Sequence, residues 1–217
     1  MTPHVLLFDL DGTLIDSKPG IVRCVRFALD QLRTPCPSEE VLASYIGPPL
    51  RGTFARLLDT DQVDRVEEAM RLYRQRFAET GLYENQIYEG IPAMLERATQ
   101  AAAYIATSKP AVYAERIVER SGLDQYFRKV YGPELDGTYD DKAELVTHLL
   151  AAEGVPPIAA VLIGDRAADV RAARLNGMRS IGVLWGYGSE RELVEAGANV
   201  LCRTPLELAG YLAAGIT

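Results

Sequence analysis

The chain has 217 residues, of which 48% are hydrophobic and 24% are charged, and its formal net charge is -7. This is the composition of an ordinary globular protein, long enough for one compact core with a modest insertion. The acidic balance argues against a nucleic-acid partner, which normally needs surplus Lys and Arg. It leaves open a small anionic substrate held in a locally positive pocket.

No apolar run approaches the roughly 20 residues of a membrane span. No signal-peptide pattern precedes the strand-like run that begins at Val5. We therefore expect a cytoplasmic protein without a membrane partner. The cysteines are odd in number and widely spaced, so reduced packing thiols are favoured over a disulfide or a metal site at Cys24, Cys36 and Cys202.

Short apolar runs predict buried parallel strands at Val5–Phe8, Tyr104–Ala106, Val161–Ile163, Ser180–Leu184 and Asn199–Leu201. Amphipathic patterns between the later runs predict helices, most clearly at Ala111–Arg120, Ala143–Ala152 and Ala167–Asn176. This alternation predicts an α/β fold, a Rossmann-like doubly wound parallel sheet.

The segment Gly20–Leu82 departs from that alternation, because it has helical periodicity and no convincing strand. Ser38, followed by two glutamates, is a plausible helix N-cap within it. A helical insertion of this size predicts a small separate domain. We therefore expect an α/β core domain at 1–17 and 87–217 and an inserted helical domain at 18–86.

Polar groups follow three of the predicted strands, where an open α/β sheet binds its ligands. Asp9 and Asp11 follow the first, "TSKP" (Thr107–Pro110) follows the second, and "GDRAAD" (Gly164–Asp169) follows the third. Acids, a hydroxyl group and a lysine should therefore meet at one edge of the sheet. The sequence predicts a site there.

Asp9 and Asp11 are two residues apart, so both carboxylates can face one pocket in extended chain. Such a pair requires a nearby cation or a shared proton. Mg²⁺ suits this oxygen-rich site, with Asp165 as a further ligand. A carboxylate beside such a cation can attack a phosphoryl group, while a second one exchanges protons with the leaving group and with water.

Each segment also has a purely structural interpretation. The Asp-x-Asp pair can close a turn, Thr107 or Ser108 can cap a helix, and Lys142 can be a solvated first-turn residue. Asp169 can form a surface ion pair with Arg166. Their joint occurrence in this order favours the site.

The segments "FDLDGTLIDS" and "IATSKP", a later lysine and "LIGDRAADV" resemble the four ordered motifs of the haloacid dehalogenase superfamily. The resemblance spans essentially the whole chain, and the insertion resembles that superfamily's C1-type helical cap. "IGPPL", "DGTYDDK" and "GVLWGYGS" resemble a phosphoglycolate phosphatase-related branch that is also described as 5'-nucleotidase-like.

The resemblance implies a role for each matching residue. Asp9 would be the nucleophile, Asp11 the general acid and base, Thr107 a phosphoryl ligand and Lys142 the neutralising cation. Mg²⁺ would be held by Asp9, the backbone carbonyl of Asp11, Asp165 and Asp169, with Asp169 otherwise holding Lys142.

Asp11 favours phosphate chemistry, because the dehalogenases of the superfamily lack this acid. No lysine lies between Lys18 and Lys109, which disfavours phosphonate hydrolysis through a cap lysine. Arg166 stands where many relatives carry Ser or Thr, and would alter the metal site's surroundings or contact substrate.

We predict substrate binding by Thr107, Ser108, Lys109 and, from the Gly47-Pro48-Pro49 loop region, Arg51. Trp185 and Tyr187 are packing residues or stack on a nucleobase. The expected activity is Mg²⁺-dependent hydrolysis of a small phosphomonoester, a nucleoside 5'-monophosphate or phosphoglycolate. A phosphomutase and a non-catalytic phosphate-binding protein are the alternatives.

Overall fold

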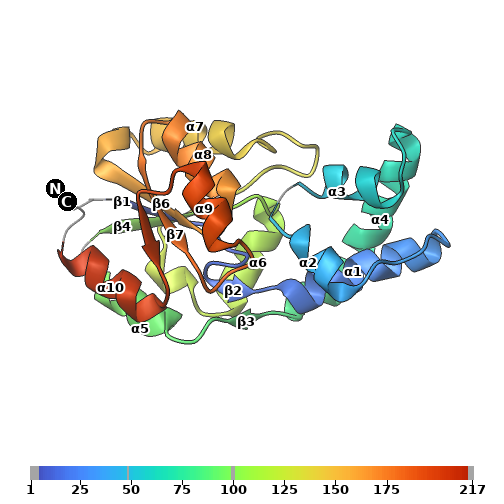
Figure 1. The fold of residues 1–217 in the computed structure, drawn as a ribbon, viewed down its shortest axis with the longest axis horizontal. Helices are drawn as coiled ribbons and strands as arrows, with labels where there is room; N and C mark the ends of the chain where they lie inside the picture. Colours follow the sequence, from blue (N-terminus) through green and yellow to red (C-terminus); the bar gives the residue numbers. More distant parts are fainter. Residues whose placement is uncertain (1–4, 48, 99–100, 215–217) are drawn as a thin grey trace. The chain divides into compact units, whose positions relative to one another are not determined.

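The computed structural model describes residues 5–47, 49–98 and 101–214. Contacts divide the chain into two compact units. The sheet unit comprises Met1–Ile15 and Ile87–Thr217, and the helical unit comprises Asp16–Gln86. Figure 1 shows the elements of both units. Their assignment as a catalytic core domain and a cap domain stays a prediction.

The sheet unit contains a six-stranded sheet in the order β5-β4-β1-β6-β7-β8, and neighbouring strands in it pair in parallel. Its strands are β1 (Val5–Phe8), β4 (Ala102–Ala106), β5 (Val130–Tyr131), β6 (Ala160–Gly164), β7 (Arg179–Val183) and β8 (Val200–Cys202). Its helices are α5 (Ile91–Arg97), α6 (Ala111–Arg120), α7 (Lys142–Ala152), α8 (Ala167–Leu175), α9 (Glu190–Ala196) and α10 (Pro205–Ala214). Strand order reverses at β1, which creates a topological switch point.

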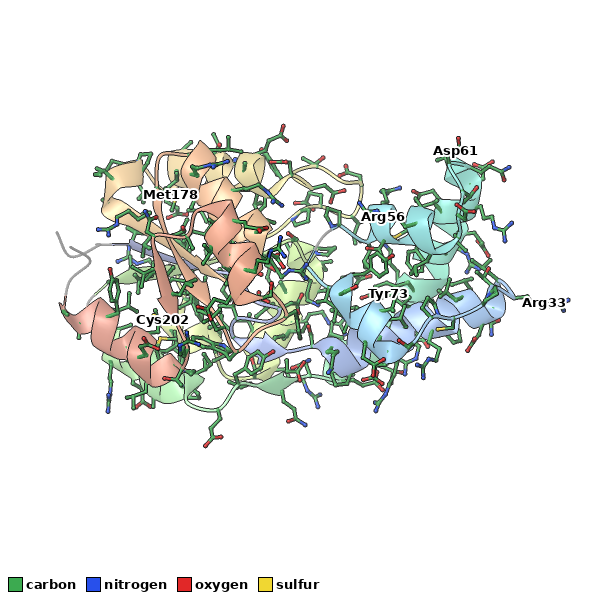
Figure 2. All side chains as sticks on the ribbon, in the orientation of Figure 1. Arg33, Arg56, Asp61, Tyr73, Met178 and Cys202 are labelled. Atoms are coloured by element: carbon green, nitrogen blue, oxygen red, sulfur yellow. The ribbon has the colours of Figure 1, made fainter. Side chains whose placement is uncertain are left out.

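Helices cover both faces of this sheet, with α7 and α8 on one side and α5 and α10 on the other (Figure 1). Strands buried on both faces read as apolar runs, as β1 and β6 do. Leu7, Tyr104 and Leu162 pack with residues of α7 and α8 in one hydrophobic core cluster. Met178, labelled in Figure 2, belongs to the same cluster.

The fold-class prediction is confirmed, and the predicted strands and helices agree with the structure to within one or two residues at each end. The sequence prediction missed β5, because a strand of two residues is too short to show a pattern. It also missed the two-stranded pairing of β2 (Ile15–Asp16) with β3 (Gln86–Ile87), at which the chain passes between the units. Short 3₁₀ turns lie at Gly81–Tyr83, Asp124–Tyr126 and Pro157–Ala159.

The helical unit contains α1 (Lys18–Gln31), α2 (Glu39–Ser44), α3 (Leu50–Leu57) and α4 (Val63–Glu79). Tyr73 lies among these helices (Figure 2), where it stacks on Phe77 and meets Phe54 edge-on. Ser38 is the N-cap residue of α2, although its side chain forms no capping hydrogen bond. Aromatic and aliphatic burial therefore holds these helices together.

The three cysteines are free, and Cys24 and Cys202 are buried. Cys24 accepts a hydrogen bond from Arg76, which also pairs with Glu84. None of the helices described here combines the length and the apolar composition needed to cross a bilayer.

Candidate active site

Strand register brings the predicted groups to one edge of the sheet. Phe8 in β1 is level with Ile105 in β4 and Ile163 in β6. The chain therefore leaves the three neighbouring strands at Asp9, Thr107 and Asp165 within about two residues of the same level. This is the carboxyl edge beside the switch point, where α/β sheets bind ligands.

Lys142 is the first residue of α7 and is only 7% exposed. Asp141 starts this helix by accepting hydrogen bonds from the N–H groups of Ala143 and Glu144. The ammonium nitrogen of Lys142 lies 2.9 Å from Asp9 Oδ1 and also pairs with Asp169 Oδ1. The helix start therefore aims a cation between two carboxylates, and the solvated-lysine interpretation is wrong.

Asp165 is fully buried at the end of β6, and both its carboxylate oxygens have partners. Thr13 Oγ1 donates to Oδ1 at 3.3 Å, and the backbone N–H of Tyr187 donates to Oδ2 at 2.7 Å. Gly12, at φ +84°, passes so close that a Cβ there would overlap this carboxylate. The chain around Asp165 is thus shaped to fix one carboxylate orientation.

Burial and crowding change the proton affinities of these groups. Burial, and after it the charges of Asp169 and Asp9, raise the pKa of Asp165 to about 8. Burial also raises the pKa of Asp169, against the opposing effect of Lys142. For Lys142, burial lowers the pKa but the charges of Asp169 and Asp9 outweigh it, so the pKa lies above its usual value. This site favours added positive charge.

Asp11 is paired with a second lysine, which sequence reasoning assigned to substrate. Lys109 Nζ lies 3.1 Å from Asp11 Oδ2, and both side chains are largely buried. Asp11 Oδ1 is buried and has no hydrogen-bond partner in the described part of the chain. The second carboxylate therefore keeps one oxygen available for proton exchange.

Carboxylate oxygens of Asp9, Asp165 and Asp169 lie within 4.8 Å of one another. Oxygen donors at this spacing suit a hard divalent cation such as Mg²⁺. The four aspartates and two lysines carry two net negative charges when all are ionised, which one such cation would neutralise. The residues at this site therefore fit a divalent cation such as Mg²⁺.

The structure brings together Asp9, Asp11, Thr107, Lys109, Lys142, Asp165 and Asp169, all in the sheet unit. Ser108, beside them in the chain, is half-buried. Arg51 lies in α3 of the helical unit and forms an ion pair with Glu67. Pro48 lies outside the described residues. The catalytic, substrate and metal roles of these residues stay predictions.

Two further structural interpretations are wrong. Neither Thr107 nor Ser108 caps a helix, because Pro110 is the N-cap of α6. Asp169 does not form a surface ion pair, because it is only 1% exposed. The buried Asp169 carboxylate accepts the backbone N–H of Arg166, and Arg166 Nε donates to Glu192. Trp185 Nε1 donates to the carbonyl oxygen of Thr13, so its polar edge is used in packing.

Sequence reasoning missed two side chains that support the site. Thr13 donates a hydrogen bond to the Asp165 carboxylate, and its position in the "DGT" turn could have indicated this role. Glu192 accepts hydrogen bonds from Arg166 Nε and from the backbone N–H of Ala167, the two residues that follow Asp165. Nothing in the local pattern around Glu192 indicates this contact.

Comparison with known proteins gives a consistent result. Residues 6–183 match the family model described as haloacid dehalogenase-like hydrolase. A 5'-nucleotidase of Pseudomonas aeruginosa is 46% identical over 190 residues, covering 87% of this chain and 86% of the relative. A phosphoglycolate phosphatase of Xanthomonas campestris is 31% identical over 215 residues, covering 95% of each chain.

The tyrosine-protein kinase PtkA of Mycobacterium tuberculosis is 34% identical over 189 residues, 86% of this chain and 64% of PtkA. A solved structure, a predicted phosphatase from Clostridium acetobutylicum, superposes with a TM-score of 0.94 at 34% identity, covering 99% of this chain and 100% of that one. The chain therefore belongs to the haloacid dehalogenase-like hydrolase family and groups with the phosphatases of that family.

Proposed function

We propose that this protein is a Mg²⁺-dependent phosphatase that hydrolyses small phosphomonoesters through an aspartyl-phosphate on Asp9. One observation carries the proposal: two buried lysines and four buried aspartates meet at the carboxyl edge of β1, β4 and β6. Structural ion pairs alone give little reason to bury this many charges in one place. Phosphoryl transfer needs them, because its catalysis consists mainly of positioning and charge neutralisation.

In the first step an oxygen of Asp9 bonds to phosphorus as the bond to the ester oxygen breaks. Asp11, through Oδ1, gives its proton to the leaving alkoxide. Lys142 holds Asp9 in place and neutralises charge, and Thr107 donates a hydrogen bond to a phosphoryl oxygen. Bound Mg²⁺, held by Asp9, Asp165, Asp169 and the Asp11 carbonyl, would supply further neutralisation of phosphoryl charge.

In the second step Asp11 takes a proton from water, whose oxygen bonds to phosphorus as the bond to Asp9 breaks. Inorganic phosphate leaves, and Asp9 and Asp11 return to their starting states. The same two carboxylates therefore serve both halves of the reaction, with Asp11 acting first as acid and then as base.

We propose a nucleoside 5'-monophosphate as the first substrate to test, supported by the 46% identical relative named 5'-nucleotidase. Phosphoglycolate is second, supported by the relative named for it. Residues 18–86 would act as a cap that selects the rest of the substrate, with Arg51 as a candidate contact. Three free cysteines support a reducing compartment, the cytoplasm.

The test is phosphate release from nucleoside monophosphates, phosphoglycolate and sugar phosphates, with Mg²⁺ or EDTA. Asp9→Asn keeps the side-chain shape and should lower turnover by a factor on the order of 10⁴ or more. Asp136→Asn, in an exposed loop, is the matched control and should leave turnover unchanged. Borohydride trapping during turnover should locate a modified residue at Asp9.

Turnover that persists in EDTA or in Asp9→Asn would refute the mechanism. Phosphate release only in the presence of an acceptor hydroxyl compound would indicate a mutase. An added arm with ATP and a tyrosine-containing peptide covers the activity named for PtkA.

A further inference from the structure

Glu192 lies in the first turn of α9, and its carboxylate contacts the start of a different helix. Its Oε1 accepts a hydrogen bond from Arg166 Nε at 3.0 Å and from the backbone N–H of Ala167 at 2.8 Å. Ala167 is the first residue of α8, where backbone N–H groups have no partner within their own helix. Glu192 therefore caps α8 from α9, its neighbour in Figure 1.

These contacts fall directly beside the proposed metal ligand Asp165. The segment just before α9 holds Asp165 through the N–H of Tyr187, 2.7 Å from Oδ2. Ser189 then begins α9 by accepting the N–H of Glu192 at 3.1 Å. Glu192 turns back to the two residues that follow Asp165, so the contacts form a closed ring through this carboxylate.

Charge supports the same assignment. Burial disfavours the Glu192 carboxylate, but the Ala167 N–H and Arg166 outweigh it and lower the pKa of Glu192. Glu192 is therefore ionised at neutral pH. Arg166 thus serves as the partner of a carboxylate, which gives a reason for arginine at this position of the motif.

We propose that Glu192 and Arg166 are positioning residues that fix Asp165 for metal binding. This inference rests on the proposed function, because it assumes that Asp165 is a metal ligand. Groups that orient metal ligands typically change metal affinity by about 10- to 100-fold when removed. The same size of effect is expected here, without direct contact between Glu192 and the metal.

The chain offers a matched control on the same helix. Glu195 forms an ion pair with Arg191 at 2.7 Å, and both side chains are exposed. Glu195→Ala removes the same residue type from the same helix without touching the ring through Asp165. Glu192→Ala removes both contacts to α8, whereas Glu192→Gln keeps an oxygen that can accept from Ala167 but loses the charge.

The experiment is calorimetric titration of the metal-free full chain with Mg²⁺, and with Mn²⁺ as a tighter-binding probe, beside thermal unfolding of each variant. Glu192→Ala should raise Kd for the metal at least tenfold, Glu192→Gln should raise it less, and Glu195→Ala should stay within twofold of the wild type. If Glu192→Ala does not fold, Arg166→Met supplies the same test and should also weaken binding.

A lower Tm for Glu192→Ala with an unchanged Kd would overturn the inference, because the pair would then be only a structural tie between α8 and α9. The wild type separates the two proposals. Absence of metal binding by the wild type refutes the metal site itself, whereas wild-type binding with unchanged affinity in Glu192→Ala and Arg166→Met refutes only the positioning role.

Discussion

Replacing Lys142 by methionine keeps the aliphatic side chain but removes the ammonium group that lies between Asp9 and Asp169. Removing one partner from a buried ion pair costs about 3–5 kcal/mol, because the remaining charge is left without compensation. Lys142 is 7% exposed, so water cannot replace it without rearrangement. We expect this loss of unfolding free energy at pH 8 in metal-free protein.

The loss should depend on pH in a defined direction. Burial already raises the pKa of Asp169, and loss of Lys142 raises it further. A carboxyl group whose folded pKa exceeds its unfolded value destabilises the fold at high pH, and the penalty disappears as pH falls towards the unfolded pKa. The difference in unfolding free energy between the wild type and Lys142→Met should therefore become smaller from pH 8 to pH 5.

Urea unfolding in EDTA at the two pH values measures this gap. Lys129→Met is the control, because Lys129 is exposed and lies 4.5 Å from the Tyr131 ring centroid. Lys129→Met should lower the unfolding free energy by about 1 kcal/mol or less at both pH values. A Lys142→Met protein as stable as the wild type at pH 8, or a gap that does not change with pH, would refute the reasoning.

Three further predictions follow from other contacts. Tyr131 and Tyr104 donate hydrogen bonds to Glu153 and lower the pKa of its carboxyl group. The stability that this carboxylate contributes is therefore present at neutral pH and lost as pH falls through the folded pKa. Urea unfolding should show Glu153→Gln to be less stable than the wild type at pH 7 but not near pH 3. Gly186→Ala puts a Cβ against Asp165 and should lower the free energy of unfolding in urea by about 1–3 kcal/mol. Gly210→Ala, where the Cβ meets open space, should not lower it. Equal effects of the two substitutions would contradict the close approach at Gly186. Arg51→Ala should raise KM about tenfold with a smaller change in kcat if Arg51 binds substrate, and steady-state kinetics with unchanged KM on every good substrate would exclude that role.

The position of the candidate site could be predicted, because apolar runs identify the strands and parallel pairing aligns the strand ends. The apolar run Val5–Phe8 identifies a buried strand, and its end fixes where Asp9 leaves the sheet. Parallel pairing with β4 and β6 then brings Thr107 and Asp165 to the same edge. Neither step requires knowledge of side-chain contacts.

The missed features depend on packing between distant segments. Glu192 lies 26 residues after Arg166, and only the packing of α9 against α8 brings them together. Lys142, in contrast, is predicted through the family resemblance alone, because a lysine after two aspartates also has the sequence signature of an exposed helix start. Its burial is visible only once β1 and α8 supply Asp9 and Asp169. A pattern shows which face is buried but not which charges meet there.

The groups predicted for phosphoryl transfer and the group predicted for substrate choice differ in how they are held. The groups that would handle the phosphoryl transfer all lie in the sheet unit and are fixed by strand ends and helix starts. Arg51, the one predicted substrate group in the helical unit, is engaged by Glu67, so its use for substrate would require exchanging one anionic partner for another. Such an exchange costs little for an ion pair open to solvent. A phosphate ester could therefore compete with Glu67 for this arginine, whereas exchanging the buried partners of Lys142 would leave a buried charge without compensation.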